Sequence, residues 1–464
     1  MDLLKNIFKG DKVIWIIFLC LCLISIIEVF SAASTLTYKS GDHWGPITQH
    51  SIILMVGAVV VVFLHNVPYK WFQVFPVFLY PISLVLLAFV TLMGIITGDR
   101  VNGAARWMTF MGLQFQPSEL AKMAVIIAVS FILSKRQDEY GANPNAFKYI
   151  MILTGLVFLL IAPENLSTAM LLFGVVCMMM FIGRVSSKKL FGMLGILGLV
   201  GGVAVGILMA IPAKTLHNTP GLHRFETWQN RVSGFFEKEE VPAAKFDIDK
   251  DAQIAHARIA IATSHVVGKG PGNSIQRDFL SQAFSDFIFA IVIEEMGLVG
   301  GIFVVFLYLW LLMRAGRIAQ KCERTFPAFL VMGIALLLVS QAILNMMVAV
   351  GLFPVTGQPL PLISKGGTST LINCAYIGMI LSVSRYVAEK EEQKAAEQQA
   401  QKEAELAAKT ERHQEMVAAM QEAITTLPSG DNATTSLPPE ENSLPDDLKA
   451  MLNAAGKREP EEEI

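Results

Sequence analysis

The sequence predicts an all-α, polytopic integral membrane protein with about ten transmembrane helices. Long apolar stretches follow one another from residue 13 to residue 386 and are separated by short polar breaks. Of the 464 residues, 53% are hydrophobic and only 16% are charged, whereas a soluble domain usually carries roughly a quarter charged residues. A transmembrane helix needs about 20 mostly apolar residues, and the stretches come close to that length or exceed it.

Ten stretches have the composition of a membrane span. The first is too long for the core of a secretory signal peptide, so we interpret it as a retained helix. The expected spans are residues 13–34, 48–66, 72–97, 115–134, 146–162, 165–183, 188–211, 282–313, 326–351 and 366–386.

The breaks between the spans predict the orientation. Starting from the N-terminus, every second break is rich in Lys and Arg, and such loops stay in the cytoplasm. Both termini are therefore expected inside the cell. The long segment 213–281, between the seventh and eighth spans, is expected to be a large extracytoplasmic loop.

The composition changes after residue 386, which ends the expected membrane domain. Residues 387–427 are rich in Ala, Glu, Gln and Lys with charges at helical spacing, which predicts a charged helical extension in the cytoplasm, or a weak coiled coil. Residues 428–464 are rich in Pro, Asp, Asn, Ser and Glu, which is typical of disorder. No basic cluster is interleaved with aromatic residues, so nucleic-acid binding is not expected.

Polar residues gather near the predicted outer face, where their desolvation calls for an explanation. Arg106 and Lys122 flank the start of the fourth span and are candidates to meet a phosphate. Glu119 lies three residues before Lys122, so both side chains share one helix face. An internal ion pair between these two residues is an equally good interpretation.

Three further segments carry candidate residues. The Gly-rich residues 267–274 could turn their backbone amides toward an anion, although a plain surface turn is the simpler interpretation. Asp286 begins the eighth span and could be a helix cap or a reactive carboxylate. The Pro/Gly-rich segment 351–369 is too apolar to be a free loop and is expected to form one wall of a site. Candidate substrate-binding residues are Asn273, Ser364 and Lys365 in these segments and Gln253 earlier in the long outer loop.

Glu294 and Glu295 lie about two helical turns deeper than Asp286. Carboxylates at that depth normally pair with a base or with backbone groups. We expect these two residues to have a structural role.

These motifs resemble those of the SEDS family (shape, elongation, division and sporulation proteins), which includes FtsW, RodA and SpoVE. The similarity runs in order from about residue 11 to residue 386. The motifs that carry it are Phe-Gln-Pro-Ser-Glu-Leu-Ala-Lys at 115–122, Gly-Lys-Gly-Pro-Gly-Asn-Ser at 268–274, Asp-Phe-Ile-Phe at 286–289, Glu-Glu-Met-Gly-Leu at 294–298 and Gly-Leu-Phe-Pro-Val-Thr-Gly-Gln-Pro-Leu-Pro at 351–361.

The resemblance implies an inverting peptidoglycan glycosyltransferase that polymerises lipid II on the outer face of the bacterial cytoplasmic membrane. It also implies a class B penicillin-binding protein as partner, together with other division proteins. Asp286 matches the essential aspartate of the family, and we assign it as the general base. Arg106 and Lys122 are expected to meet the leaving diphosphate, with Glu119 orienting Lys122. No cofactor is certain, but a divalent cation (Mg²⁺ or Mn²⁺) could share the diphosphate charge.

Two departures from the family pattern bear on this expectation. Asn165 stands where relatives tend to carry an acid, so a role that needs negative charge there is in doubt. Lys365 adds a cation at the outer face.

Alternatives remain open at this stage. They are a lipid II flippase, a noncatalytic scaffold that activates the penicillin-binding partner, and an elongation polymerase of the RodA type. The clustering of polar motifs at one face favours catalysis over transport, and the charged tail favours the FtsW branch over the RodA branch.

Overall fold

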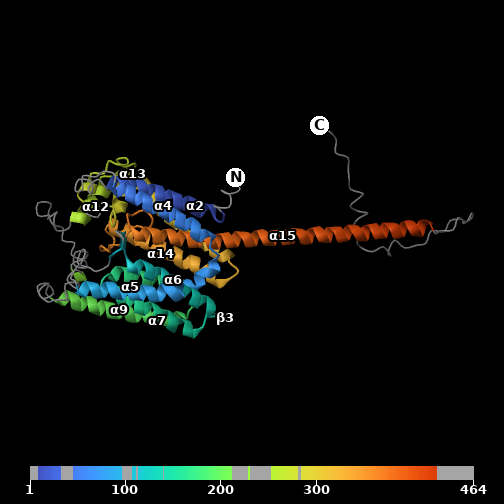
Figure 1. The fold of residues 1–464 in the computed structure, drawn as a ribbon, viewed down its shortest axis with the longest axis horizontal. Coiled ribbons are helices and arrows are strands. Elements are labelled where there is room, and N and C mark those ends of the chain that lie inside the picture. Colours follow the sequence, from blue (N-terminus) through green and yellow to red (C-terminus); the bar gives the residue numbers. More distant parts are fainter. Residues whose placement is uncertain are drawn as a thin grey trace, which may run out of the picture. The chain divides into compact units, whose positions relative to one another are not determined.

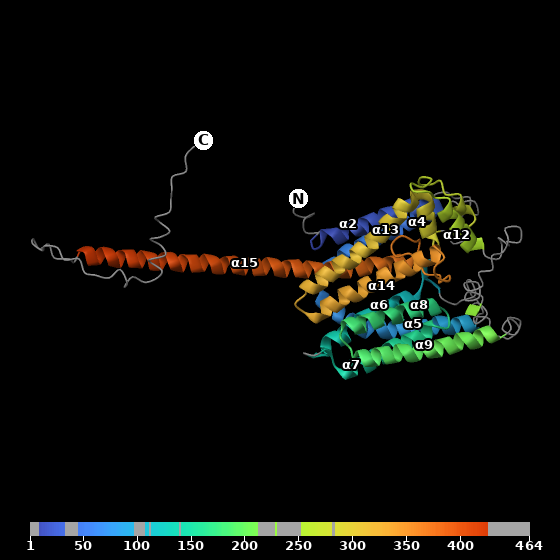
Figure 2. The same cartoon turned by 180° about the vertical axis from the view of Figure 1, so that it is seen from behind.

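The structure is a computed structural model that describes residues 9–32, 45–96, 107–110, 113–138, 141–211, 228–229, 252–280 and 284–425. The chain forms two compact units, Met1–Gln393 and Lys394–Ile464. The first unit is a helical bundle, shown from two sides in Figures 1 and 2.

Ten apolar helices make up the described part of the bundle. Nine of them are long and apolar enough to cross a membrane, and α8 is a shorter apolar helix of 17 residues. Each overlaps one of the ten predicted spans, which confirms the all-α polytopic prediction. They are α2 (Lys12–Ala32), α4 (Gly45–Asn66), α5 (Phe75–Ile96), α6 (Pro117–Lys135), α7 (Pro144–Ile161), α8 (Leu166–Ile182), α9 (Ser187–Ala210), α13 (Ile288–Lys321), α14 (Thr325–Ala349) and α15 (Thr368–Thr425).

Short elements connect these helices. Helix α12 (Ala252–Ala262) and the 3₁₀ turn η3 (Gln276–Asp278) lie in the predicted outer loop, and α12 packs against α13. A further 3₁₀ turn, η1 (Tyr69–Gln73), precedes α5.

Two small antiparallel hairpins, which the sequence did not predict, complete the described elements. In the first, β1 (Met108–Phe110) pairs with β2 (Leu113–Phe115), placing Met108 opposite Phe115. In the second, β3 (Gln137–Asp138) pairs with β4 (Gly141–Ala142). Figure 1 shows β3 and α12 at opposite ends of the bundle, and we call these the β3 end and the α12 end.

Local sequence explains where several helices begin and bend. Pro117 is in the first turn of α6, where its missing N–H costs nothing, and Glu119 lies near the positive end of the helix dipole. Asn165 caps α8, because its Oδ1 accepts a hydrogen bond of 3.2 Å from the Thr168 amide. Within α13, Gly297 has non-helical dihedrals (φ 71°, ψ −173°) that kink the helix.

Helices α6 and α14 form the buried centre of the bundle. Helix α14 packs against α6, α8 and α13, and the membrane-spanning parts of α6 and α14 are mostly buried. Helix α9 packs against α8 at the edge and is almost entirely exposed. Its exposed apolar side chains fit a bilayer, because lipid chains replace the protein interior there.

Helix α15 runs without interruption from Thr368 to Thr425. The tenth predicted span and most of the predicted helical extension are therefore one helix. Its residues beyond Glu391 whose burial is described are exposed. The predicted disordered tail, 428–464, lies outside the described residues.

Candidate functional site

Asp286 occupies a turn immediately before α13 at the α12 end of the bundle. Its Oδ1 accepts a hydrogen bond of 3.0 Å from the Ser285 hydroxyl, and its side chain is half-buried. The N-cap of α13 is Phe287, and no side chain makes a capping hydrogen bond there. Asp286 therefore lies one residue before the N-cap position, and the helix-cap interpretation is not supported.

Asn345 on α14 connects the turn of Asp286 to the Pro/Gly-rich segment. Its Nδ2 donates to the backbone carbonyl of Asp286 at 2.9 Å and to that of Gln358 at 2.7 Å. Without Asn345, each of these two carbonyls would lose a hydrogen-bond donor, and a buried carbonyl without a donor lowers the stability of the fold. Asn345 thus fixes the backbone of Asp286 relative to the segment.

Ser364 and Lys365 lie on the other side of the same turn. The Ser364 hydroxyl donates to the Ser285 carbonyl at 2.6 Å and accepts from the Leu360 amide at 2.8 Å. The Lys365 amide donates to the Phe284 carbonyl at 2.9 Å, and its Nζ lies 5.8 Å from the Phe284 ring centroid. Partial burial lowers the pKa of Lys365 below the ordinary lysine value.

Lys122 and Glu119 form a buried ion pair on α6. Lys122 Nζ lies 2.8 Å from Glu119 Oε1, and both side chains are almost completely excluded from solvent. The same Nζ donates to Gln341 Oε1 on α14 at 2.9 Å, and Gln341 Nε2 donates to the Pro359 carbonyl at 3.0 Å. The ion pair is therefore connected, through Gln341, to the Pro/Gly-rich segment, which also contacts the turn of Asp286 through Asn345.

The Pro/Gly-rich segment also contacts α8. The Gln358 amide donates to the Thr168 hydroxyl, and Thr168 belongs to the capping turn of Asn165. Asn165 thus shapes the start of a helix that contacts the Pro/Gly-rich segment.

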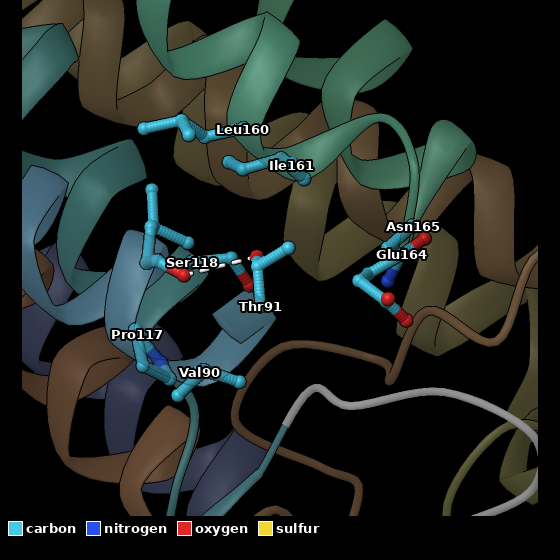
Figure 3. A pocket seen from close by; sticks show the side chains of 9 residues that line it. Val90, Thr91, Pro117, Ser118, Leu160, Ile161, Glu164 and Asn165 are labelled. Atoms are coloured by element: carbon cyan, nitrogen blue, oxygen red, sulfur yellow. Dashed lines mark hydrogen bonds between the residues drawn. The ribbon is translucent and has the colours of Figure 1, made fainter. Parts of the chain in front are cut away.

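A small cavity lies beside Asn165, between the ends of α5, α6, α7 and α8. Figure 3 shows Glu164 and Asn165 on one side of it and Ser118 and Thr91 on the other, with Leu160 and Ile161 above. The Thr91 hydroxyl is turned to its own helix, where it donates to the Leu87 carbonyl at 3.0 Å. A cavity of about 20 Å³ has room for a water molecule but not for a sugar ring.

The Gly-rich loop faces an anion that belongs to its own chain. The Gly272 and Ser274 amides donate to the Glu295 carboxylate at 2.9 and 3.2 Å. The Glu294 carboxylate accepts from the Ile275 and Gln276 amides at 3.2 and 3.3 Å. We call this arrangement, residues 268–277 around Glu294 and Glu295, the carboxylate clamp.

Side chains complete the carboxylate clamp. Lys269 Nζ pairs with Glu294, and the Ser274 hydroxyl also donates to that residue. Arg277 donates to the Gly272 carbonyl at 2.7 Å and to the Ser31 hydroxyl of α2 at 2.8 Å. The pairing expected for the two glutamates, with a base and with backbone groups, is confirmed, and the contacts tie the outer loop to α13 and α2.

The remaining predicted site residues lie farther out or outside the description. Asn273 is exposed, and its side chain donates to the Lys269 carbonyl at 3.0 Å. Gln253 is half-buried at the start of α12. Arg106 lies outside the described residues. Of the predicted set, the structure brings together Asp286, Ser364 and Lys365, and it connects Lys122 and Glu119 to them through α14.

Sequence reasoning missed Gln341, Gln358 and Thr168. Gln341 stands four residues before Asn345, so both amides share one face of α14. Two amides at that spacing in an otherwise apolar span were a signal that could have identified Gln341.

Metal ligands are sparse in the described part of the chain. No three His, Cys, Asp or Glu side chains there come together in an arrangement that could hold a metal ion. The sequence also carries an alternating run of carboxylates, Asp247, Asp249 and Asp251, which lies outside the described residues.

Comparison with known proteins gives a consistent picture. A family model described as "Cell cycle protein" (FtsW, RodA, SpoVE) matches residues 11–389. A protein of Geobacter sp. strain M18, named probable peptidoglycan glycosyltransferase FtsW, is 31% identical over 82% of this chain and 98% of its own length. Stage V sporulation protein E of Bacillus subtilis is 30% identical over 81% of this chain and 97% of its own.

Solved structures share the fold. The rod shape determining protein RodA of Thermus thermophilus superposes with a TM-score of 0.56 at 23% identity, covering 82% of this chain and 98% of RodA. A chain from a structure described as the coordination of polymerization and crosslinking by a peptidoglycan synthase complex gives a TM-score of 0.64 at 24% identity, with 82% and 99% covered. From the family match over most of its length, this chain belongs to the FtsW/RodA/SpoVE family of cell cycle proteins.

Proposed function

We propose that this chain is a peptidoglycan glycosyltransferase that polymerises lipid II for septal wall synthesis in cell division. Family membership and relatives named as FtsW glycosyltransferases support the proposal. The observation that carries it is the placement of Asp286. Its half-buried carboxylate stands on a turn whose backbone is bonded to α14 and to the Pro/Gly-rich segment.

The proposed site faces the outside of the bacterial cytoplasmic membrane. The distribution of Lys and Arg in the breaks supports this orientation, with both termini in the cytoplasm. A substrate with a long lipid tail suits a site at the end of a membrane bundle, because the tail can stay in the bilayer while the head group reaches Asp286. Lipid II has that architecture.

The reaction is a single displacement with inversion. The 4-hydroxyl oxygen of one lipid-linked disaccharide attacks the anomeric carbon of another, the bond to undecaprenyl diphosphate breaks, and an α linkage becomes β. Asp286 accepts the hydroxyl proton, a contribution of about 10²–10⁴ in rate for a typical general base. No second carboxylate is needed as acid, because the diphosphate leaves as a stable anion; this differs from glycoside hydrolysis.

Cations stabilise the diphosphate as its charge develops. Lys365 is positioned through the same turn as Asp286. Lys122 acts from behind the Pro/Gly-rich segment, held by Glu119 and Gln341, and Arg106 is the third candidate. A bound Mg²⁺ or Mn²⁺ ion would supply further positive charge to the leaving diphosphate.

The proposal includes a class B penicillin-binding protein as partner, which cross-links the strands, and other division proteins. A lipid II flippase is the competing function, since buried polar residues within membrane helices are also typical of transport pathways. Ser25, His50 and Glu28 are such residues in α2 and α4. Their presence makes a transport assay a necessary part of the test.

The decisive experiment measures polymerisation of purified lipid II by wild type and Asp286→Asn, each with and without the cognate penicillin-binding protein. Asp278→Asn is the matched control, because Asp278 is an exposed acid in the outer loop that precedes Asp286. We expect long glycan strands from wild type and the control and none from Asp286→Asn at equal membrane yield.

Two results would contradict the proposal. Equal products from Asp286→Asn and wild type would remove Asp286 as the base. Absence of polymer from every variant, together with lipid II translocation in proteoliposomes, would establish transport instead.

A further inference from the structure

Two turns at the β3 end of the bundle are joined into one surface. The Ala142 amide in the α6–α7 turn donates to the Arg184 carbonyl in the α8–α9 turn at 3.3 Å. Gly141 lies so close to this turn that an added Cβ would stand 2.7 Å from the Arg184 carbonyl oxygen. Its φ of 133° is also one that glycine adopts most readily. The close approach of the two turns therefore depends on glycine at position 141.

Six cations lie on the joined turns and on the helix ends beside them. Five are exposed, and the sixth, Arg136, lies with its guanidinium 4.2 Å from the centroid of the Tyr149 ring. The six, which we call the basic patch, are Lys135, Arg136, Lys148, Arg184, Lys188 and Lys189.

The basic patch differs from three other cations at this end of the bundle, which have acidic partners. Arg314 pairs with Asp11, Lys321 with Glu391 at 2.9 Å, and Arg385 with Glu389 at 3.5 Å. Within the described residues, no member of the basic patch forms an ion pair with an acidic side chain. Segregation of Lys and Arg to one side of a membrane explains their presence, and the contact between the two turns places them on one surface.

An apolar stripe begins directly beside the basic patch. Tyr149, Ile152, Leu156 and Leu159 are all exposed on α7, and their spacing of three and four residues places them on one helix face. Tyr149 stands at the boundary between this stripe and the cations, a position that aromatic side chains favour at membrane interfaces. Phe191 and Leu194 are exposed at the start of α9 as well.

We propose that the basic patch binds the phosphodiester head group of an anionic glycerophospholipid, with the acyl chains lying along the exposed stripe of α7. Basic clusters between transmembrane helices are suited to such head groups. A continuous passage from cations through an aromatic ring to an apolar helix face matches a lipid better than an acidic protein, which would need only the charges. The site lies at the end of the bundle away from Asp286, and the inference does not depend on the proposed reaction.

The test measures lipid preference in nanodiscs of phosphatidylcholine that contain a minor fraction of phosphatidylglycerol. The patch variant carries Lys148→Gln, Arg184→Gln and Lys188→Gln, and Arg136 is kept because it contacts Tyr149. The control variant carries Lys12→Gln, Lys70→Gln and Arg317→Gln, which removes three exposed cations at the same end of the bundle. Spin-labelled phosphatidylglycerol reports the relative association constant, and thermal unfolding checks both folds.

We expect the patch variant to lose its preference for phosphatidylglycerol by at least about fivefold, the factor associated with a single cation near a charged membrane surface. The control variant keeps the wild-type preference. A charge-preserving variant, Lys148→Arg with Lys188→Arg, should also keep the wild-type preference, which separates an effect of charge from an effect on folding.

Several outcomes would overturn the inference. If the patch and control variants lose the same preference for phosphatidylglycerol, the preference comes from general surface charge. If the patch variant loses no preference, the basic patch is not a lipid site. Displacement of the lipid by soluble glycerophosphoglycerol at equal concentration would make it a phosphate site rather than a lipid site. Patch-dependent binding of polyglutamate, with lipid preference unchanged, would assign the patch to an acidic protein.

Discussion

At the scale of single residues, the amides of Asn345 and Gln341 decide how the site is held. Each belongs to α14 and donates to a carbonyl of the Pro/Gly-rich segment. Asn345 also fixes the backbone of Asp286, and Gln341 also accepts from Lys122. One helix face thus positions both the proposed base and a proposed cation.

Replacing Asn345 with Leu, which has a similar volume, should lower kcat by about 10²-fold, because small misplacements of a reacting group have effects of that size. It leaves two carbonyls without this donor, at about 1–3 kcal/mol of stability each. Substrate binding through other residues should leave KM nearly unchanged. Polymerisation kinetics with the purified variant measure kcat and KM separately. A rise in KM with unchanged kcat would assign Asn345 to substrate binding instead.

Lys122 combines a structural and a possible electrostatic role, and a paired substitution separates them. Lys122→Met alone leaves the buried Glu119 carboxylate without its cation and should cost about 3–5 kcal/mol. Adding Glu119→Gln removes the unpaired charge and should recover thermal stability.

If Lys122 stabilises the diphosphate, the stable double variant remains impaired in turnover. Recovery of both unfolding temperature and polymerisation would show that the ion pair has only a structural role.

The lowered pKa of Lys365 predicts a pH dependence. Because burial favours the neutral amine, the protonated fraction of Lys365 falls at a lower pH than for an ordinary lysine. If the cation assists the leaving diphosphate, activity should decline on the alkaline side as pH rises through this lowered pKa.

Lys365→Arg should move that decline to higher pH, since arginine stays protonated. Rate–pH profiles of the two proteins measure the shift. Superimposable alkaline limbs would exclude Lys365 as the titrating group.

At the scale of elements, the carboxylate clamp holds a loop that would otherwise have few apolar contacts. Its geometry requires glycine at Gly268, where φ is 81° and an added Cβ would lie 2.3 Å from the Glu295 carbonyl oxygen. Gly272 has a similar φ of 84°, but its added Cβ would meet no atom within 4 Å.

These two glycines form a matched pair for a stability test. Gly272→Ala should cost only the backbone strain of a positive φ, about 1–3 kcal/mol. Gly268→Ala adds a clash with backbone and should be clearly more destabilising. Thermal unfolding of both variants checks the order, and equal effects would contradict the close approach seen at Gly268.

At the scale of the whole molecule, contacts within the membrane unit hold the part of α15 that belongs to that unit. Arg385 donates to the Asn66 side chain and carbonyl at 3.1 and 3.2 Å, and Ser384 accepts from the Asp11 amide at 2.7 Å. These contacts, together with the Lys321–Glu391 pair, all lie within the unit Met1–Gln393.

A chain truncated after Gln393 should therefore keep its unfolding temperature and its in vitro polymerisation. Removal of Lys394–Ile464 should change only functions that need the cytoplasmic tail, such as recruitment to the division site. Loss of membrane yield or polymerisation in the truncated protein would show that the tail supports the membrane unit.

The sequence by itself determined the class of fold and the positions of the spans. Backbone groups in lipid have no water to bond, so each crossing of a helical bundle must be a helix long enough to span the bilayer, and such lengths are visible in the apolar stretches. Local chemistry also fixed the start of α6 at Pro117 and the cap of α8 at Asn165, because caps involve residues only a few positions apart. The hairpins β1–β2 and β3–β4 were too short to leave such a pattern.

Only the tertiary structure decided which polar groups meet. By its sequence the Gly-rich loop was either a plain surface turn or a loop whose amides face an anion; the structure shows the second, and the anion is the pair Glu294 and Glu295, about twenty residues away on another element. Lys122 reaches Gln341 across 219 positions of sequence, a contact that no local spacing encodes. Helix packing creates these partnerships, and the cost of leaving a buried polar group unpaired then makes them specific.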